Sequence, residues 1–556
     1  MATKKSAGSP PARRMLPVLL GVLAGALVVV YFPNSGYHAP DGIGYFSHLP
    51  AVWTTRDLDV LPWFERFGVV FPVGLSERGY AINVWPAGTA MVWSWGYLLS
   101  QLLAEKRAMF VLTNFVSSLA GITAALLTVL AVRRFGLGWR TAAGCGAAAW
   151  FGTPLFFYSF CMTQSAHPTT AMLAAVFLGS WMFTYGDRNP WRWSLLGVLL
   201  GIMASVRPQE ALNGLVLLLE SFDGIIIQRQ RFGLLVRLMS RAVGGALIGY
   251  APQMAMTWQV HGAPWVQAQG FNVGIENFSG LDTLLSPYHG VLWWTPAMLL
   301  GFAGLLAGVR RHGMVSVGLA AVCAAQVGVN AFVTAFWNGN SFGIRLLTGT
   351  AFAVGVGIAF GAETLRDRRL RTTWFAVVAV CCLWTCMLSF GVAAGGIDSS
   401  SPYTVASFLK MAAGVPAACV RGMRFMAKPR EPEFLWVAAG MIGGAVWIIR
   451  KGILWWRRGR FRRLAWVLIA ASAVWAAAIV TTVWNRPVYT RRQATMLVTP
   501  QDQRNCFLLA DLLVRARYHR MIGDHRAAER MERRARSLTF RAPFARWFAY
   551  QRFTRG

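Results

Sequence analysis

Charged residues are scarce in this sequence, and acidic ones are the scarcest. Asp, Glu, Lys and Arg make up 14% of the 556 residues, and only 22 residues are acidic. Soluble domains carry about a quarter charged residues. Hydrophobic residues make up 55% of the chain, and the mean hydropathy is +0.45. This balance excludes a soluble globular protein and indicates that lipid is the main solvent of the chain.

Cysteine is also rare, and its spacing is informative mainly for what it excludes. None of the 8 cysteines has the spacing of a metal site. Cys381, Cys382 and Cys386 lie in an apolar run and are expected to be small buried residues. Cys419 and Cys506 could pair if both face outward. Internal repeats and low-complexity tracts are absent too, which argues against repeat architectures.

Long apolar runs, in contrast, recur along most of the chain. Roughly fourteen runs of about 16–25 residues are each long enough to cross a ~30 Å hydrocarbon core. The first run, Met15 to Phe32, follows a basic segment and lacks a small-residue cleavage site, so it is predicted to be a transmembrane helix rather than a signal peptide. The predicted fold is an all-α polytopic membrane protein with a bundle of roughly 12–14 helices.

The net charge of +32 does not indicate nucleic-acid binding here, because most basic residues lie in short turns between apolar runs. Such turns are typical of the cytoplasmic side and of contact with anionic lipid headgroups, so membrane lipids are expected partners and nucleic acid is not. The clusters that set this orientation are Arg133/Arg134/Arg140, Arg188/Arg192, Arg229/Arg231, Arg310/Arg311, Arg366–Arg369 and Arg450–Arg463.

Three segments are predicted from this pattern. Residues 1–14 form a basic cytoplasmic N-terminus, residues 15–484 a transmembrane domain with residues 33–84 as its first outer loop, and residues 485–556 a helical, arginine-rich extension. Trp85–Leu103 either crosses the membrane or, with fewer basic residues left outside, does not cross it fully. In the extension, Leu508–Tyr518 and Arg526–Leu538 are predicted to form a helical hairpin.

An acidic residue, Asp41, directly follows the first apolar run and its connecting segment. Downstream, Tyr45, Leu49, Val52 and Trp53 recur at helical spacing, which predicts an amphipathic helix at the membrane surface. Asp41 is then either a base at the membrane–water boundary or a residue that begins the helix after the turn Pro40-Asp41-Gly42.

Several outward-facing motifs resemble segments of the type-C glycosyltransferases, which are polytopic enzymes that use polyprenyl-phosphate sugars. The resemblance covers about Met15 to Gly361, with Ile344 standing where a proline is usual and with no match in the extension. The motifs that carry it are Asp41-Gly42-x-x-Tyr45 with Arg56-Asp57-Leu58-Asp59, Gly152–Tyr158 followed by His167, Ser286–Gly290 with Trp294-Thr295-Pro296, and Trp337-Asn338-Gly339 with Ser341-Phe342-Gly343-x-Arg345.

The resemblance implies inverting transfer of a sugar from a polyprenyl-phosphate donor to a glycan, lipid or protein acceptor. The enzyme would lie in a bacterial inner membrane, with its active site facing the periplasm or exterior. Such a transfer needs a carboxylate base near the attacking hydroxyl and positive charge at the departing phosphate. Asp41 is the base candidate, and Arg345 is the first candidate for the phosphate, followed by Arg207. Both arginines could instead be interfacial anchors.

Further candidates for substrate contacts have structural alternatives. Tyr45, Tyr288 and His289 could touch the sugar or phosphate, or could serve helix and turn packing. His167 is either a ligand or a hydrogen-bonding structural residue. Trp337 could stack on a sugar, whereas most outer tryptophans belong to the interfacial girdle.

A divalent cation is a possible cofactor, because Asp57 and Asp59 could join Asp41 in offering carboxylate oxygens. Two other functions stay open. A transporter or flippase of an anionic lipid would use charged residues within the membrane, and only Glu220 and Asp223 lie in the middle runs. An O-antigen ligase-like or polymerase-like enzyme would use a large late outer loop such as Gly395–Glu433, which holds one acid, Asp398, ahead of Glu431.

Overall fold

The computed structural model describes residues 40–66, 73–74, 76–101, 108–265, 274, 278–333, 341–399, 402–426, 455, 460–481, 497–498, single positions between 505 and 520, and 524–539. The predicted helix Met15–Phe32, the candidate Trp337 and the possible Cys419–Cys506 pair lie outside what the structure describes. The description below concerns the remaining residues.

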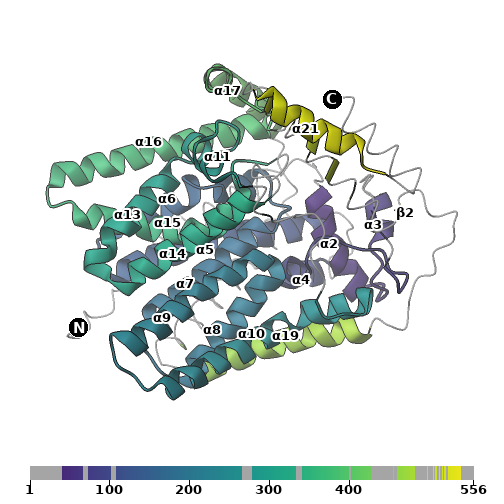
Figure 1. The fold of residues 1–556 in the computed structure, drawn as a ribbon, viewed down its shortest axis with the longest axis horizontal. Helices are drawn as coiled ribbons and strands as arrows, with labels where there is room; N and C mark the ends of the chain where they lie inside the picture. The colour runs from purple at the N-terminus through teal and green to yellow at the C-terminus, as the bar shows by residue number, and fades with distance from the viewer. Residues whose placement is uncertain are drawn as a thin grey trace.

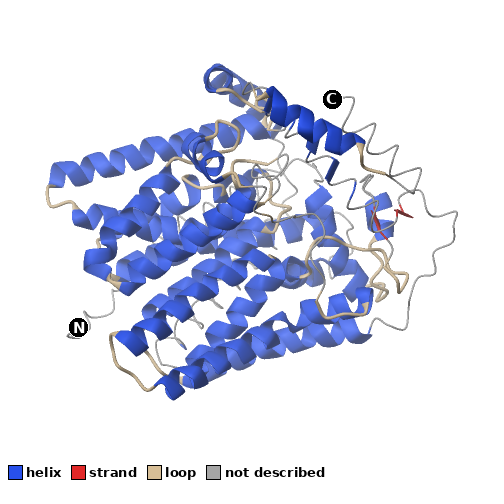
Figure 2. Cartoon of the chain, viewed as in Figure 1, coloured by secondary structure: helices blue, strands red, loops and turns tan. Residues whose placement is uncertain are grey.

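Almost all of the described chain is helical, and its long helices run side by side, as Figures 1 and 2 show. The long helices are α5 (Ala108–Arg134), α6 (Trp139–Phe151), α7 (His167–Phe183), α8 (Pro190–Val206), α9 (Leu215–Ile226), α10 (Phe232–His261), α13 (Ala297–His312), α14 (Met314–Phe332), α15 (Ala351–Thr364), α16 (Arg368–Ala393) and α19 (Phe461–Val480). Among the described residues, 6 helical segments are long and apolar enough to span a membrane. The predicted all-helical membrane architecture is confirmed.

Basic residues gather at one end of this bundle, which we call the basic end. These residues lie in the turns after α5, α7, α9, α13 and α15, and contacts join neighbouring turns. His312 of α13 lies 2.8 Å from Glu363 of α15, and Arg188 lies 3.3 Å from Glu220 of α9. The clustering of arginines in alternate turns therefore follows the sequence prediction.

Small residues let the helices pack closely. At the crossing of α8 and α10, a Cβ added to Gly197 would lie 2.0 Å from the carbonyl oxygen of Ala242, and one added to Gly245 would lie 2.4 Å from that of Ser194. Backbone-to-backbone contact of this kind is typical of membrane helix pairs, in which van der Waals packing rather than water exclusion drives association.

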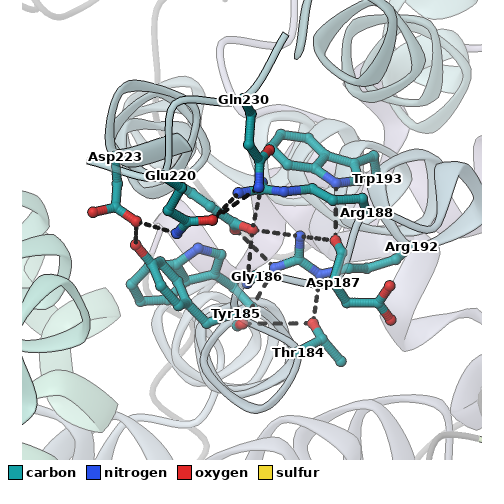
Figure 3. A network of polar contacts seen from close by, with 12 residues as sticks. Thr184, Tyr185, Gly186, Asp187, Arg188, Arg192, Trp193, Glu220, Asp223 and Gln230 are labelled. Carbon is teal, nitrogen blue, oxygen red and sulfur yellow. Dashed lines mark hydrogen bonds and ion pairs between the residues drawn. The ribbon is translucent and has the colours of Figure 1, made fainter. Parts of the chain in front are cut away.

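At the basic end a buried carboxylate is fully paired (Figure 3). Arg192, with a fully buried side chain, donates to both oxygens of Glu220 at 2.9 and 2.8 Å, and the backbone N–H of Gly186 donates to Oε1 at 3.0 Å. Nearby, Tyr185 donates to Asp223 at 2.7 Å. The two acids that a transporter could have used thus hold the α7–α8 turn against α9.

Shorter elements lie at the opposite end, which we call the site end. They include α2 (Pro40–Trp53), the helix predicted from the spacing of Tyr45, Leu49, Val52 and Trp53, and α3 (Leu61–Arg66). Helix α2 is buried along most of its length, so it packs into the bundle rather than lying on its surface. Helix α4 (Gly88–Gln101) has 14 described residues, or about 21 Å, and residues 102–107 after it lie outside the description. Whether Trp85–Leu103 crosses the membrane fully stays a prediction.

The late segment Gly395–Glu433, predicted to be an outer loop, contains a long helix, α17 (Val405–Met426). The hydrophobic side chains Phe408, Ala412 and Val415 give α17 one buried face, because they recur at helical spacing.

The C-terminal extension lies at the site end. Its strand β2 (Leu497–Val498) pairs in parallel with β1 (Val73–Gly74) of the first outer loop. Helix α21 (His525–Arg536) agrees with the predicted second helix of the extension, and Ala535 packs against Leu509 and Leu512 in a small separate core.

Candidate functional site

Asp41 lies in the first turn of α2, and two glycines let this turn enter the bundle. A Cβ added to Gly42 would lie 2.5 Å from the Cβ of Gln164, and one added to Gly44 would lie 2.1 Å from the ring of Trp85. Only glycine allows so close an approach at these positions. Close packing thus requires the two glycines of Asp41-Gly42-Ile43-Gly44. This packing places the Asp41 carboxylate beside Trp85.

The Asp41 carboxylate joins two partners that come from distant parts of the chain. Arg345 Nη1 donates to Oδ2 at 2.5 Å, and Trp85 Nε1 donates to Oδ1 at 3.1 Å. The side chains of Asp41 and Arg345 are 30% and 16% exposed, so the pair is only partly removed from water. A carboxylate held by a guanidinium and an indole N–H is oriented while it stays reachable from the site end.

Arg345 begins the 3-10 helix η5 (Arg345–Thr350), which leads into α15. Its Nη1 serves Asp41, whereas its Nε is buried without a hydrogen-bond acceptor among the described residues. A buried guanidinium N–H without an acceptor is costly, and an oxygen of an oxyanion such as phosphate would satisfy it. Arg345 can therefore serve Asp41 and an anionic ligand in turn.

A second buried cation lies close by. Arg207 ends α8, where Pro208 starts the 3-10 helix η3 (Pro208–Gly214), and it is 7% exposed. Its Nη1 donates to Nδ1 of His167 at 2.9 Å, so this imidazole is an acceptor and carries no charge. His167 also hydrogen-bonds to the backbone of Arg345. The histidine thus connects the two arginines, as a structural residue would, while it lies within the site.

Two tyrosines complete the surroundings of the arginines. Tyr45 is buried one turn after Asp41, and burial raises its pKa to about 12 while Arg207, Asp41 and Arg345 act on it through their charges. Its hydroxyl is therefore a neutral hydrogen-bond donor across the physiological range. Tyr158, from the π-helix η2 (Phe157–Cys161), accepts a hydrogen bond from the Phe342 N–H at 3.0 Å and so fixes the segment before Arg345.

Trp85 is held in place from behind. Its carbonyl oxygen lies 2.8 Å from His48 Nε2, and its N–H donates to Asn83 Oδ1 at 3.0 Å. Burial lowers the pKa of His48 to about 4, so the ring is neutral at pH 7. The same three residues line a small pocket beside α10 that also includes Gln253.

Tyr288 and His289, predicted as possible sugar contacts, lie in a packed turn. His289 has no exposed surface, donates from Nε2 to the Ser399 carbonyl oxygen at 2.9 Å and stacks on Trp294 with ring centroids 4.8 Å apart. Burial lowers its pKa to about 4. Tyr288 is 1% exposed. The geometry favours the alternative prediction, turn packing, for both residues.

Asp57 and Asp59 do not join Asp41. Asp57 Oδ1 accepts from the N–H of Asp59 at 2.9 Å, and Asp59 Oδ1 accepts from the N–H of Leu61 at the start of α3 at 3.0 Å. Among the described residues, groups of three or more His, Cys, Asp or Glu that could hold a metal ion are absent. The residues therefore do not fit the possible cation, and the chemistry below uses none.

The sequence predicts Asp41, Arg345, Arg207, His167 and Tyr45 as candidate site residues, and the structure brings all five together. It missed Trp85 and Tyr158 as site residues, because a tryptophan near a membrane surface is ordinarily a girdle residue. The pair of glycines after Asp41 indicates a close approach to α2 but does not identify Trp85 as the neighbour.

Comparison with known proteins gives structural similarities only. Neither a protein-family model nor a curated protein sequence matches the chain. A crystal structure of ArnT from Cupriavidus metallidurans in the apo state is similar at a TM-score of 0.45 and 18% identity, over 85% of this chain and 78% of that one. The archaeal oligosaccharyltransferase AglB from Archaeoglobus fulgidus, in complex with an inhibitory peptide and a dolichol-phosphate, is similar at 0.41 and 12%, over 68% and 56%. At these values neither similarity decides what this chain does.

Proposed function

We propose that this protein is an integral-membrane glycosyltransferase that moves a sugar from a polyprenyl-phosphate donor to an acceptor hydroxyl at the site end. The observation that supports this most directly is the ion pair between Asp41 and Arg345, which sets a reachable carboxylate beside a guanidinium with an unused N–H. Sugar transfer from a lipid phosphate needs a base near the acceptor hydroxyl and positive charge near the departing phosphate.

In the proposed cycle, the donor phosphate replaces Asp41 on Arg345. The phosphodiester carries one negative charge and enters a site with the partly exposed Arg345, the buried Arg207 and one carboxylate. Once the phosphate occupies the guanidinium, the Asp41 carboxylate is free to accept a hydrogen bond from the acceptor hydroxyl. Before a donor binds, the ion pair thus keeps both side chains oriented and leaves neither charge without a partner.

The transfer itself is a single displacement. The acceptor oxygen attacks the anomeric carbon and loses its proton to Asp41, while the bond from that carbon to the phosphate oxygen breaks. Attack from the face opposite the phosphate inverts the anomeric configuration. The phosphate gains a second negative charge as it leaves, and Arg345 and Arg207 stabilise that charge more in the transition state than in the bound donor.

We place the site end on the periplasmic or exterior side of a bacterial inner membrane, because the basic end carries the arginine-rich turns. The acceptor is then a glycan, lipid or protein exposed on that side.

The transporter alternative loses its main support, because Glu220 and Asp223 serve the paired network of Figure 3. In the late segment, the ligase-like alternative has only one acid ahead of Glu431, which is Asp398. The backbone carbonyl oxygen of Asp398 accepts a hydrogen bond from the Tyr403 hydroxyl at 2.7 Å.

Purified protein in proteoliposomes, supplied with polyprenyl-phosphate sugars labelled in the sugar, tests the proposal. Appearance of labelled acceptor together with free polyprenyl phosphate supports it. Movement of intact labelled lipid between leaflets, with the sugar still attached, would instead identify a flippase.

A further inference from the structure

Glu210 is a buried carboxylate next to the proposed phosphate site that the reaction above does not use. It lies in η3, three residues after Arg207, and none of its surface is exposed. Oε2 accepts from Asn213 Nδ2 at 2.8 Å and lies 3.5 Å from Gln326 Nε2. Oε1 is buried and has no hydrogen-bond partner among the described residues.

The backbone makes room for this carboxylate at a glycine. A Cβ added to Gly349 would lie 2.8 Å from each of the two Glu210 oxygens. Gly349 belongs to η5, the same short helix that begins with Arg345. The Glu210 carboxylate therefore packs against η5, which supplies Arg345 as one proposed phosphate ligand. In the sequence, Glu210 lies three residues after Arg207, the other proposed ligand.

Comparison with Glu220 shows that Glu210 is not an ordinary structural acid. Glu220 is equally buried, but two arginines and a backbone N–H occupy its oxygens, as Figure 3 shows. Glu210 forms no ion pair within 4.0 Å in the described part of the chain and has only amide donors. Burying a charge without a paired counter-charge costs free energy. The protein avoids this cost when the group becomes neutral.

Burial and the nearby cation act on the pKa of Glu210 in opposite directions. Arg207 is the cation that acts on it most, and Arg207 in turn is affected by Tyr45, Arg345 and Asp41. Gln326 of α14 and Gly349 of η5 bring no charge. Burial raises the pKa of Glu210 to about 7 against the opposing effects of Arg207 and Asn213, so the group can titrate near neutral pH.

We propose that Glu210 is a positioning residue that balances the charge of the phosphate site: it is ionised while the site is empty and takes a proton from solvent when a phosphate monoester binds Arg345 and Arg207. The balance is one proton taken up on binding and returned on release, and no other bond changes. The proposal rests on the proposed function, because the monoester is the lipid phosphate that sugar transfer would release.

The sign of the pH dependence follows. The bound dianion repels the Glu210 carboxylate and raises its pKa further, so binding is favoured by protonation. Product affinity should rise as the pH falls through about 7 in the wild type. In Glu210→Gln the repulsion is absent at every pH, so the variant should bind the monoester about tenfold more tightly than the wild type at pH 8.5 and about equally at pH 6.

The experiment measures farnesyl monophosphate binding to the full chain in detergent by titration calorimetry, in two buffers of different ionisation enthalpy at pH 7. The proton uptake of the wild type should exceed that of Glu210→Gln. Glu65→Gln, an exposed acid on α3, is the matched control and should behave as the wild type. Gel filtration and a thermal melt check that each variant is folded.

Asn213→Ala provides an independent readout should Glu210→Gln fail to fold. It removes the hydrogen bond that stabilises the carboxylate, so the midpoint of the pH dependence should move to higher pH. Equal proton uptake and equal pH dependence in wild type and Glu210→Gln, or an unmoved midpoint in Asn213→Ala, overturn the role of Glu210 alone. A wild type that does not bind the monoester at all overturns the phosphate site and the proposed function with it.

Discussion

Asp41 and Arg345 are 304 residues apart in the sequence, and their side chains meet at 2.5 Å. The pair joins α2, the first described helix, to the start of η5 ahead of α15, so it depends on most of the bundle being assembled. Neither group is fully buried, which distinguishes this pair from the enclosed Arg192–Glu220 pair at the basic end. An ion pair that is reachable and has a spare N–H is suited to exchange partners with a ligand.

Replacing Arg345 should remove most of the phosphate stabilisation. Arg345→Ala is expected to lower kcat/KM for the labelled donor by about a hundredfold or more, because a cation aimed at developing charge is worth roughly that much. The kcat/KM of Arg345→Lys should lie between those of the wild type and Arg345→Ala, since lysine keeps the charge and loses the planar fork. Arg368→Ala, an exposed arginine at the basic end, is the control. Equal rates in all three variants would show that Arg345 is an interfacial anchor.

His167 should matter through Arg207. His167→Leu removes the acceptor at 2.9 Å and is expected to raise the donor KM about tenfold, because an Arg207 without its partner is poorly oriented. His167→Asn keeps an acceptor atom near the position of Nδ1 and should restore part of the affinity. Loss of kcat with an unchanged KM would indicate that His167 acts directly on the reacting atoms.

Gly44 should tolerate no side chain. Gly44→Ala would place a Cβ 2.1 Å from the Trp85 ring and displace the indole from Asp41, at a cost of about 1–3 kcal/mol in unfolding free energy. Gly328→Ala, in α14 with nothing within 4 Å of its added Cβ, should be neutral or slightly stabilising. Thermal melts in detergent compare the two. A Gly44→Ala variant as stable and active as Gly328→Ala would contradict the packing described for α2.

The Glu220 network should stabilise the fold without taking part in transfer. Glu220→Gln leaves Arg192 buried and uncompensated, which is expected to cost about 3–5 kcal/mol. Glu363→Gln, whose partner Arg311 is 60% exposed, should cost about 1 kcal/mol or less for that pair. Activity per folded molecule should stay near wild type in both variants. A folded Glu220→Gln protein that has lost all activity would revive the transporter alternative.

Much of the site could be predicted from the sequence, because its residues occupy recognisable local patterns. The spacing of Tyr45, Leu49, Val52 and Trp53 predicts α2. Asp41, the base candidate, and Arg345, the first candidate for the phosphate, lie in direct contact. The helix prediction depends on short-range periodicity, which a sequence displays directly, and the choice of Asp41 and Arg345 depends on the resemblance of the segments around them.

What the sequence could not supply was long-range contact. Nothing local distinguishes Trp85, which donates to Asp41, from a girdle tryptophan. Likewise, the sequence shows Glu210 only as an acid that follows a proline. The structure shows that it is enclosed, because the Gly349 backbone packs against its carboxylate. The pairing of β1 with β2 places the extension at the site end, and two residues on each strand carry no pattern that predicts it.

The most direct test of the central claim is single-turnover sugar transfer by Asp41→Asn, with donor binding measured on the same preparation. Removing a general base is expected to lower the transfer rate by about 10²–10⁴-fold. The neutral amide no longer competes with phosphate for Arg345, so donor affinity should be kept or improved. A variant that binds the donor and transfers sugar at the wild-type rate would contradict the assignment of Asp41 as the base.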